Sequence, residues 1–173
     1  VLCNGANLGF RKASVANYLS AVRADLASGD DIFLLHYLKR SKGKIVCLNN
    51  KEGTVSTSFS GRLNSFILQR RRWAGKGLYY KDADTIILAL ATLAANLSVL
   101  TALIIILIKS ACFLPALLIY AAKSIPEFLL LSGYLENPGK IKTLFLFIPA
   151  SLLYPLYAVF IAAISPFSSN KWS

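Results

Sequence analysis

The pattern of apolar and polar positions divides the chain into a polar first half and an apolar second half. From Ile86 to Ile108 no charged residue occurs. This run of about 23 residues exceeds the ~20 that a helix needs to cross the hydrocarbon core of a bilayer. Asp84 precedes the run and Lys109 follows it. The pattern therefore predicts a transmembrane helix over residues 86–108.

Two further apolar tracts follow, over residues 112–134 and 143–165. The first contains two prolines, and it carries Lys123 one helical turn before Glu127. A charged pair inside a membrane segment marks a candidate functional site. A helix lying at the membrane surface, with both side chains reaching water, is the alternative interpretation. The sequence therefore predicts two or three transmembrane helices, followed by a short tail over residues 167–173.

The charges lie mainly in the first half. Residues 1–84 hold 14 of the 19 Lys and Arg and 6 of the 8 Asp and Glu. Because basic segments stay on the cytoplasmic side, the first half is expected there. With three crossings Lys140 and Lys142 are cytoplasmic as well, which favours three. This half is expected to form one domain over residues 1–84, followed by a membrane region over residues 85–166.

Local patterns in residues 1–84 alternate between helix and strand. Apolar residues at helical spacing and turn residues between the segments mark the boundaries. Two segments rich in β-branched residues read as short strands. Such alternation predicts an α/β fold. The expected helices cover residues 14–27, 32–40 and 60–75, and the expected strands cover residues 44–50 and 53–59.

Composition narrows the class of protein. The net charge of +11 suggests a polyanionic partner such as anionic lipid, a phosphorylated substrate or nucleic acid. With 55% hydrophobic residues the chain is too apolar for a typical soluble nucleic-acid binder. Three cysteines without metal-ligand spacing predict neither a disulfide framework nor a zinc site. The chain has a single histidine, which argues against a metal site made of histidines and against a serine or cysteine nucleophile activated by histidine.

The stretch "QRRRW" lies on the expected helix before the first span. Gln69, Arg72, Trp73 and Lys76 fall at i, i+3, i+4 and i+7 and therefore share one face. A guanidinium is a fork of donors suited to phosphate, and an indole is a flat apolar surface suited to a sugar ring. The alternative is a basic helix that binds lipid headgroups. The two arginines that precede Arg72 lie off this face and are candidates for that role.

Two other stretches contain polar residues that fit a ligand site. Asp30 and Asp31 stand where a loop enters a helix, and one carboxylate there is usually an N-cap. A second one, kept ionised by the helix N-terminus, is able to act as a general base. Near the start of the chain, "NGANLGFRK" contains Asn4, Gly5, Asn7 and Arg11, which suit a tight turn, a close backbone approach and a positive charge.

The order of these stretches, "NGANLGFRK", "SGDD", "QRRRW" and then apolar spans, resembles the membrane-bound family 2 glycosyltransferases, which include cellulose- and hyaluronan-synthase-like enzymes. "QRRRW" is similar to the family's Q-x-x-R-W motif at Gln69, Arg72 and Trp73. "GDD" is similar to its acidic motif. The resemblance implies the C-terminal part of a GT-A-like domain, with Asp31 as the catalytic base and Asp30 as its neighbour.

The resemblance also implies a reaction and a location. A sugar moves with inversion from a nucleotide-diphosphate donor to a lipid or glycan acceptor at a bacterial inner membrane, in contact with membrane lipids. Asn4, Gly5, Asn7 and Arg11 are then an acceptor-side loop, while Gln69, Arg72 and Trp73 bind diphosphate and acceptor. No nucleic acid is expected as a partner.

The family's divalent metal, Mg²⁺ or Mn²⁺, is held by a D-x-D motif in a donor-binding half. No D-x-D precedes "GDD" here, and "DAD" at residues 82–84 reads as the polar edge of the first span. The donor half and the metal ligands are therefore expected before residue 1, with none of the ligands in this chain. Two alternatives stay open: a non-catalytic, membrane-anchored basic scaffold, and a transferase that adds a single sugar to a lipid.

Overall fold

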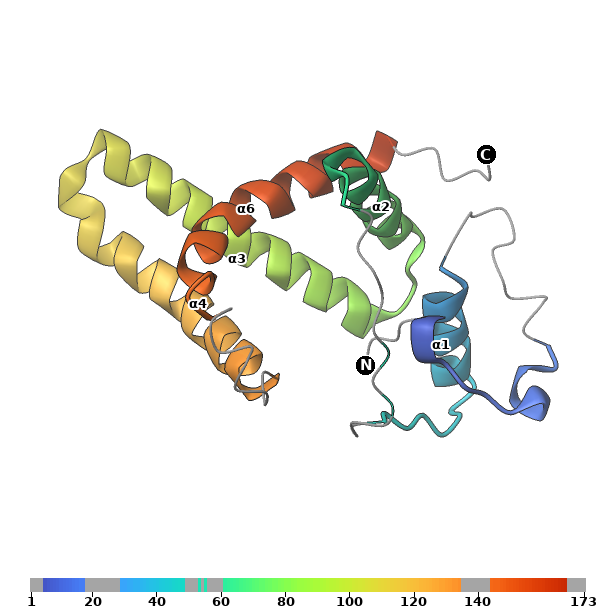
Figure 1. Cartoon of the computed structure of the whole chain (residues 1–173). Helices are drawn as coiled ribbons and strands as arrows, with labels where there is room; N and C mark the ends of the chain where they lie inside the picture. Colours follow the sequence, from blue (N-terminus) through green and yellow to red (C-terminus); the bar gives the residue numbers. More distant parts are fainter. Residues whose placement is uncertain are drawn as a thin grey trace. The chain divides into compact units, whose positions relative to one another are not determined.

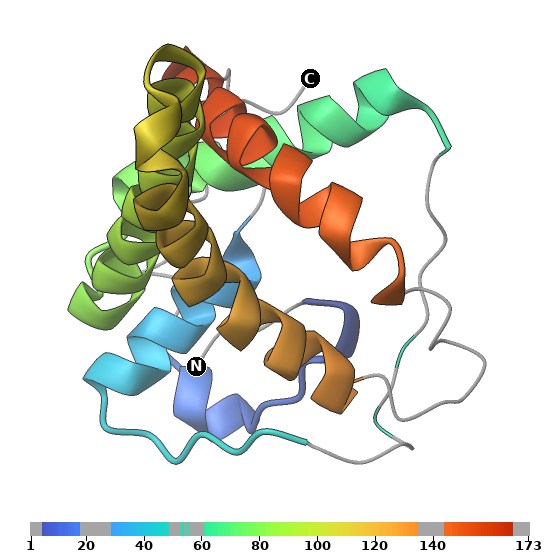
Figure 2. The ribbon, with the colours of Figure 1, turned by 90° about the vertical axis from the view of Figure 1, so that its left-hand side faces the viewer.

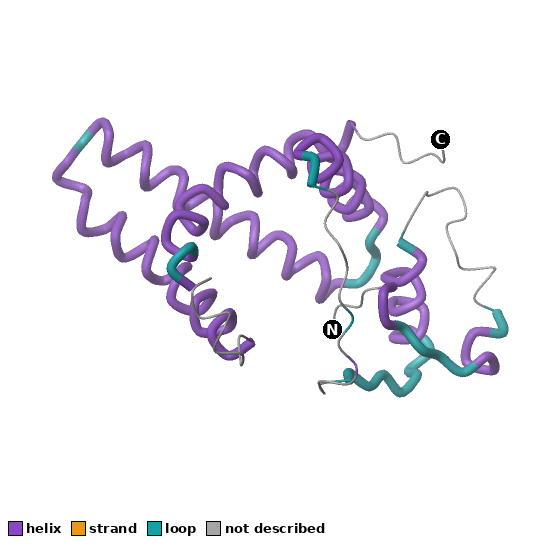
Figure 3. Tube along the Cα trace, viewed as in Figure 1, coloured by secondary structure: helices purple, strands orange, loops and turns teal. Residues whose placement is uncertain are grey.

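The structure is a computed structural model of the whole chain, and it describes residues 5–17, 29–48, 53, 55, 61–134 and 144–167. Within these residues the chain forms two compact units, one made of residues 1–86 together with 164–173, the other of residues 87–163. Every regular element described is helical (Figures 1 and 3). The five α-helices described are α1 (Asp30–Arg40), α2 (Leu63–Gly75), α3 (Ala83–Ile108), α4 (Phe113–Tyr134) and α6 (Phe147–Ile164).

The expected α/β fold is wrong for the part of the chain that the structure describes. Residues 44–48 of the first expected strand run as loop, and Val46 and Leu48 are exposed. A strand is stable only when its backbone pairs with a neighbour and one of its faces is buried, and this segment has neither among the described residues. Of the second expected strand the structure describes only Gly53 and Val55. Residues 49 and 50 lie outside the described residues.

Two of the three expected helices are confirmed, and the third lies mostly outside the described residues. The helix predicted over residues 32–40 is confirmed as α1, and the one predicted over 60–75 is confirmed as α2. Of the helix predicted over residues 14–27, the structure describes a short 3-10 turn at Lys12–Val15 and the two residues after it. Residues 18–27 are not described, so the rest of that prediction stays a prediction.

Helix α1 begins and ends with distinct backbone motifs. Its N-cap is Gly29, at φ 108°, a left-handed conformation that favours glycine. The expected capping by an aspartate is therefore wrong, because Asp30 and Asp31 follow the cap as the first residues of the helix. At the other end Lys42, at φ 53°, takes the left-handed position that ends a helix, and the Gly43 amide donates to the Leu38 carbonyl at 2.8 Å.

Helix α1 packs through its apolar face and is tied to the residues that start α3. Ile32, Leu34 and Leu35 are buried. On the polar side Lys39 forms ion pairs of 2.6 Å with both Asp82 and Asp84. Asp82 also accepts hydrogen bonds from the backbone and the hydroxyl of Thr85, as an N-cap does. The "DAD" stretch is thus a helix cap and a docking point for α1 within this unit.

The described residues contain three helices that are long and apolar enough to cross a membrane, over Ala83–Ile108, Ser110–Gly133 and Phe147–Phe167. These are the features of an integral membrane protein. Helix α4 continues through both of its prolines. Pro115 lies in its first turn, where no backbone bond is lost, whereas Pro126 removes one bond from the interior. From residue 113 to residue 134 the tract therefore forms one continuous helix.

Several polar side chains of the second unit donate hydrogen bonds within their own helices. Helices α3 and α4 form a hairpin around a short turn at Ser110–Cys112, and Figure 2 shows the ribbon from the side of this turn. Thr92 and Thr101 each donate to the carbonyl four residues earlier. Such bonds are typical of helices in hydrocarbon, where no water is available to satisfy a hydroxyl.

Candidate active site at the start of α1

Asp31 is held by backbone groups from two separate segments. Its Oδ2 accepts a hydrogen bond from the Gly5 amide at 3.0 Å, and its Oδ1 accepts one from the Ile32 amide at 2.8 Å. The carboxyl group therefore has a fixed orientation while its side chain stays partly exposed. Asp30 beside it is exposed. Two adjacent carboxylates thus have different environments at the first turn of one helix.

The loop that begins the described chain approaches Asp31 closely. A Cβ placed on Gly5 would lie 3.7 Å from the Asp31 Cβ, which is ordinary contact. Asn7 donates from its side chain to the Gly53 carbonyl at 2.5 Å, so this loop is anchored to a segment far along the sequence. Arg11 is exposed and its carbonyl accepts from the Ser14 amide. Asn4 lies outside the described residues.

Lys76 connects the acidic motif with helix α2. Its residue is only 8% exposed, and its side chain lies across Gly29 at the cap of α1. A Cβ built on Gly29 would come within 2.9 Å of the Lys76 Cδ and 3.1 Å of the Phe33 Cε2, so a larger residue would displace these side chains. The cap conformation at φ 108° favours glycine as well.

Charged residues of both the "GDD" and the "QRRRW" motifs influence the pKa of Lys76. Burial lowers the pKa of Lys76, while the charge of Asp31 raises it, the charge of Arg72 lowers it, and Asp30 raises it again. Charges act on this lysine from α1 and from α2 alike. The charges of Asp31 and Arg72, which are far apart in the sequence, thus both influence the pKa of this lysine.

Lys76 was not among the site residues predicted from the sequence. The signal that reveals it is its spacing, because it follows Gln69, Arg72 and Trp73 on the same helical face. A lysine just past the end of a basic helix reads as one more surface charge. Its burial depends on Gly29, which comes from a different helix, and no local pattern reports that contact.

The three arginines of "QRRRW" have three different environments. The Arg70 guanidinium lies 4.9 Å from the centre of the Phe66 ring and 4.7 Å from that of the Trp73 ring. Arg71 donates to the carbonyl oxygens of Ile164 and Phe167. Arg72 is exposed. The expectation that the first two serve lipid headgroups is not supported, because both are engaged within the protein.

Gln69 and Trp73 complete the predicted face of α2. Gln69 is exposed, and Trp73 is 40% exposed although Arg70 stacks on its ring. The arginine stack fixes one side of the indole and leaves a substantial part of the ring accessible. An exposed amide, an exposed guanidinium and a rigid indole therefore lie on α2, and the buried lysine directly follows the end of this helix.

The described residues contain no group of three or more His, Cys, Asp or Glu side chains that would hold a metal ion.

Comparison of the chain with models of known protein families, with curated proteins and with solved structures finds no match in any of the three.

Proposed function

We propose that this protein is a membrane glycosyltransferase that moves a sugar, with inversion, from a nucleotide-diphosphate donor to a lipid or glycan acceptor. The observation that supports this proposal most is the buried Lys76, on which the charges of both Asp31 and Arg72 act. The sequence resemblance assigns proton transfer to one of these motifs and binding of the diphosphate to the other. A transferase needs both at one site.

Asp31 is the group that removes the proton of the acceptor hydroxyl. Its carboxylate is oriented by the Gly5 and Ile32 amides before any substrate binds. As the proton moves to the carboxylate, the hydroxyl oxygen forms a bond to the anomeric carbon. The bond from that carbon to the diphosphate oxygen breaks, and its electron pair leaves with the nucleoside diphosphate. Positioned general bases of this kind contribute about 10²–10⁴-fold to rate.

Arg72 and Gln69 act on the departing diphosphate. The guanidinium is exposed and has donors in a fork that suits two phosphate oxygens. Trp73 offers its accessible surface to a sugar ring, and Arg70 keeps the indole in place. A divalent cation, when bound, would supply further neutralisation of the diphosphate charge.

The reaction is placed at the cytoplasmic face of a bacterial inner membrane. The three candidate spans support a membrane location. The excess of Lys and Arg in residues 1–84 supports the cytoplasmic side for the catalytic residues. A lipid or glycan acceptor at that surface would reach the exposed groups of α1 and α2 from the water phase.

The test is to compare Asp31→Asn with Asp30→Asn in isolated membranes that contain the protein. Transfer from a panel of radiolabelled nucleotide-diphosphate sugars to lipid and to glycan is measured for each. We expect the first variant to lose at least ~10²-fold in rate, because an amide cannot accept the proton. The second variant keeps most of the rate, since Asp30 does not receive the Gly5 bond. Equal rates for wild type and Asp31→Asn would show that the base lies elsewhere.

A non-catalytic, membrane-anchored scaffold is the second candidate. Two arginines of "QRRRW" favour it, because both make contacts inside the protein. Arg70 stacks on the Trp73 ring, and Arg71 donates a hydrogen bond to the Ile164 carbonyl, so this part of the motif has a structural role. If wild-type membranes transfer no sugar from any donor in the panel, this candidate replaces the first.

A further inference from the structure

Helix α1 is fastened near its C-terminal end to the residues where the first candidate span begins. Lys39 forms ion pairs of 2.6 Å with Asp82 and Asp84. The His36 ring, one turn earlier, donates to the Thr85 hydroxyl at 3.2 Å, because that hydroxyl itself donates to Asp82. The span begins at residue 83. All of these residues belong to the first unit, so the contacts fix this end of α1 beside the start of the membrane helix.

The N-terminal end of α1 is held by the stretch that leads into the same span. The Lys76 side chain lies across Gly29, the cap of α1. Helix α1 has 11 residues and is therefore about 16 Å long. Asp31 is its second residue and lies about 8 Å along the helix axis from His36. The proposed base is thus held within about one length of α1 from the membrane entry.

The stretch directly before the span has the composition of a membrane interface. Leu78 is 65% exposed, and Tyr79 and Tyr80 follow it half-buried. Tyrosine is enriched at the level of the lipid headgroups, because its ring is apolar and its hydroxyl is polar. Tyr80 also packs edge to face against the Phe33 and His36 rings of α1, with ring centres 6.2 Å and 5.3 Å apart. This favours a position of α1 next to the headgroups.

The loop that approaches Asp31 combines exposed apolar and basic side chains. Its Gly5 amide donates to the Asp31 carboxylate at 3.0 Å. A few residues later Leu8 is 38% exposed and Phe10 is 56% exposed, and Arg11 beside them is exposed as well. Apolar side chains together with a cation favour contact with a bilayer surface. The carboxylate is therefore approached by a segment that suits lipid.

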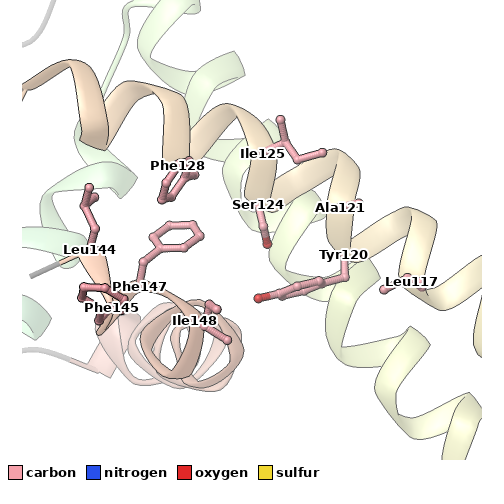
Figure 4. Close-up of a pocket in the computed structure, with 10 residues that line it drawn as sticks. All are labelled: Leu117, Tyr120, Ala121, Ser124, Ile125, Phe128, Leu144, Phe145, Phe147 and Ile148. Atoms are coloured by element: carbon pink, nitrogen blue, oxygen red, sulfur yellow. The ribbon is translucent and has the colours of Figure 1, made fainter. Parts of the chain in front are cut away.

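The apolar groove of the second unit offers no second place for the reaction. It lies between α4 and the residues that begin α6, and Phe128, Phe147 and Ile148 are among the residues that line it (Figure 4). The described residues of its lining include no carboxylate to accept a proton and no cation to bind a diphosphate. The hydroxyl that receives the sugar is therefore expected at Asp31, in the first unit.

We propose that the acceptor is a membrane lipid that carries its reactive hydroxyl in the headgroup, and not a glycan free in the water phase. The inference rests on the proposed function and adds the class of acceptor to it. The lipid hydroxyl gives its proton to Asp31 while its oxygen bonds to the anomeric carbon of the donor sugar. The bond from that carbon to the diphosphate breaks, and the nucleoside diphosphate leaves with the electron pair. Lys39 is a positioning residue, because its ion pairs hold α1 at the membrane entry.

The experiment measures how far above the bilayer the acceptor hydroxyl is used. The full chain is placed in lipid nanodiscs with the panel of radiolabelled nucleotide-diphosphate sugars. The acceptors are diacylglycerol, phosphatidylglycerol, and diacylglycerol extended by ethylene-glycol spacers that raise a terminal hydroxyl to about 30 Å, twice the length of α1. The same spacers without acyl chains are the soluble controls. Transfer through a tether is fastest when its length matches the distance to be spanned.

We expect the fastest transfer for the lipids without a spacer, or with spacers no longer than about 16 Å, the length of α1. The soluble controls should react at least ~10²-fold more slowly, because they lack the tether. Soluble controls that react as fast as the lipids, or a maximum only near the longest spacer, would overturn the lipid acceptor and leave sugar transfer standing. No transfer to any acceptor would overturn the proposed function, and this inference with it.

Lys39→Met tests the positioning role. The ratio of transfer between short and long spacers should fall by about 2- to 10-fold, the range for two partly exposed ion pairs. Arg40→Met is the matched control: it removes the same charge from the next residue, which forms no ion pair among the described residues, and it should keep the ratio. Asp84→Asn removes only one of the two pairs and should shift the ratio less, which provides a milder variant if Lys39→Met does not fold. An unchanged ratio in both latter and former latch variants, Asp84→Asn and Lys39→Met, would overturn the role of Lys39.

Discussion

Each unit contains a lysine whose side chain is buried, and the charges of the two lysines are stabilised in different ways. Lys76 lies across Gly29, and the charges of Asp31 and Arg72 act on it from two helices. Lys123 pairs with Glu127 one turn along its own helix, at 3.0 Å, and lies 5.2 Å from the centre of the Tyr154 ring. The first lysine joins segments that are distant in sequence. The second is neutralised locally.

The difference between the two lysines follows from the medium around each one, because hydrocarbon and water stabilise a charge to different extents. Inside a bilayer a charge must find its partner close by, because water cannot stabilise it, and the i,i+4 position is the nearest available. Outside a bilayer a lysine is able to remain exposed to water, so the burial of Lys76 requires neighbouring groups that offset the cost of removing its charge from water. Such sites are candidates for function. We therefore expect substitutions near Lys76 to affect the proposed activity, and substitutions of the Lys123–Glu127 pair to affect stability alone.

The largest effect is expected at the proposed transferase site. Arg72→Lys keeps the charge near Lys76 but loses the forked donor. Sugar transfer should fall by about 10²–10³-fold, the range for loss of one preorganised donor to a developing anion. The measurement is transfer of radiolabelled sugar in membranes. Arg71→Lys is the control, because Arg71 donates to the carbonyls of Ile164 and Phe167 and should not contact substrate. A fully active Arg72→Lys variant would remove Arg72 from the site.

A smaller effect, on stability, tests the burial of Lys76. Gly29→Ala adds a Cβ 2.9 Å from the Lys76 Cδ, at a residue with φ 108°. We expect a loss of about 1–3 kcal/mol in the free energy of unfolding in detergent, from strain at the backbone and displacement of the lysine. Gly61→Ala is the matched control: its φ is also positive, at 68°, but no atom of the described residues lies within 4 Å of an added Cβ. If both variants lose the same stability, Lys76 is not confined by Gly29.

The local pair should contribute less. A double-mutant cycle of Lys123→Met and Glu127→Gln measures the coupling between the two side chains in thermal unfolding. Since Lys123 is buried while Glu127 is 40% exposed at its side chain, we expect a coupling of about 1 kcal/mol, the upper end for partly exposed pairs. A coupling of zero would contradict the idea that the helix neutralises its own lysine.

The smallest effect concerns pH in the first unit. Burial lowers the pKa of His36 below its ordinary value of 6.5, although Asp82 raises it, while Lys39 and Arg40 lower it further. The unfolded state then binds the proton more readily, so stability is full above about pH 6.5 and falls as the pH decreases below it. Unfolding midpoints between pH 7.5 and pH 5 should show a small fall, and His36→Gln should abolish it. This window lies above the range in which Asp82 titrates, because Lys39 and Thr85 lower the pKa of Asp82.

The apolar pattern by itself determined the membrane part. An uncharged apolar segment that is long enough to cross a bilayer can adopt few structures. In hydrocarbon every backbone N–H and C=O group needs a hydrogen-bond partner within the protein, which a helix provides within the segment. The same local logic predicted α1 and α2 and placed Lys123 beside Glu127. These features depend on neighbours within one helical turn, which a sequence displays directly.

Only the tertiary structure decided where the polar residues meet. The segment at residues 44–48 has the composition of a strand but no partner to pair with among the described residues, and strand formation depends on that partner. Arg71 is engaged because two carbonyls near residue 164 lie within its reach. Lys76 is buried because a glycine on another helix leaves space for it. Each of these outcomes depends on a contact between residues far apart along the chain, where no periodicity in the sequence records the distance.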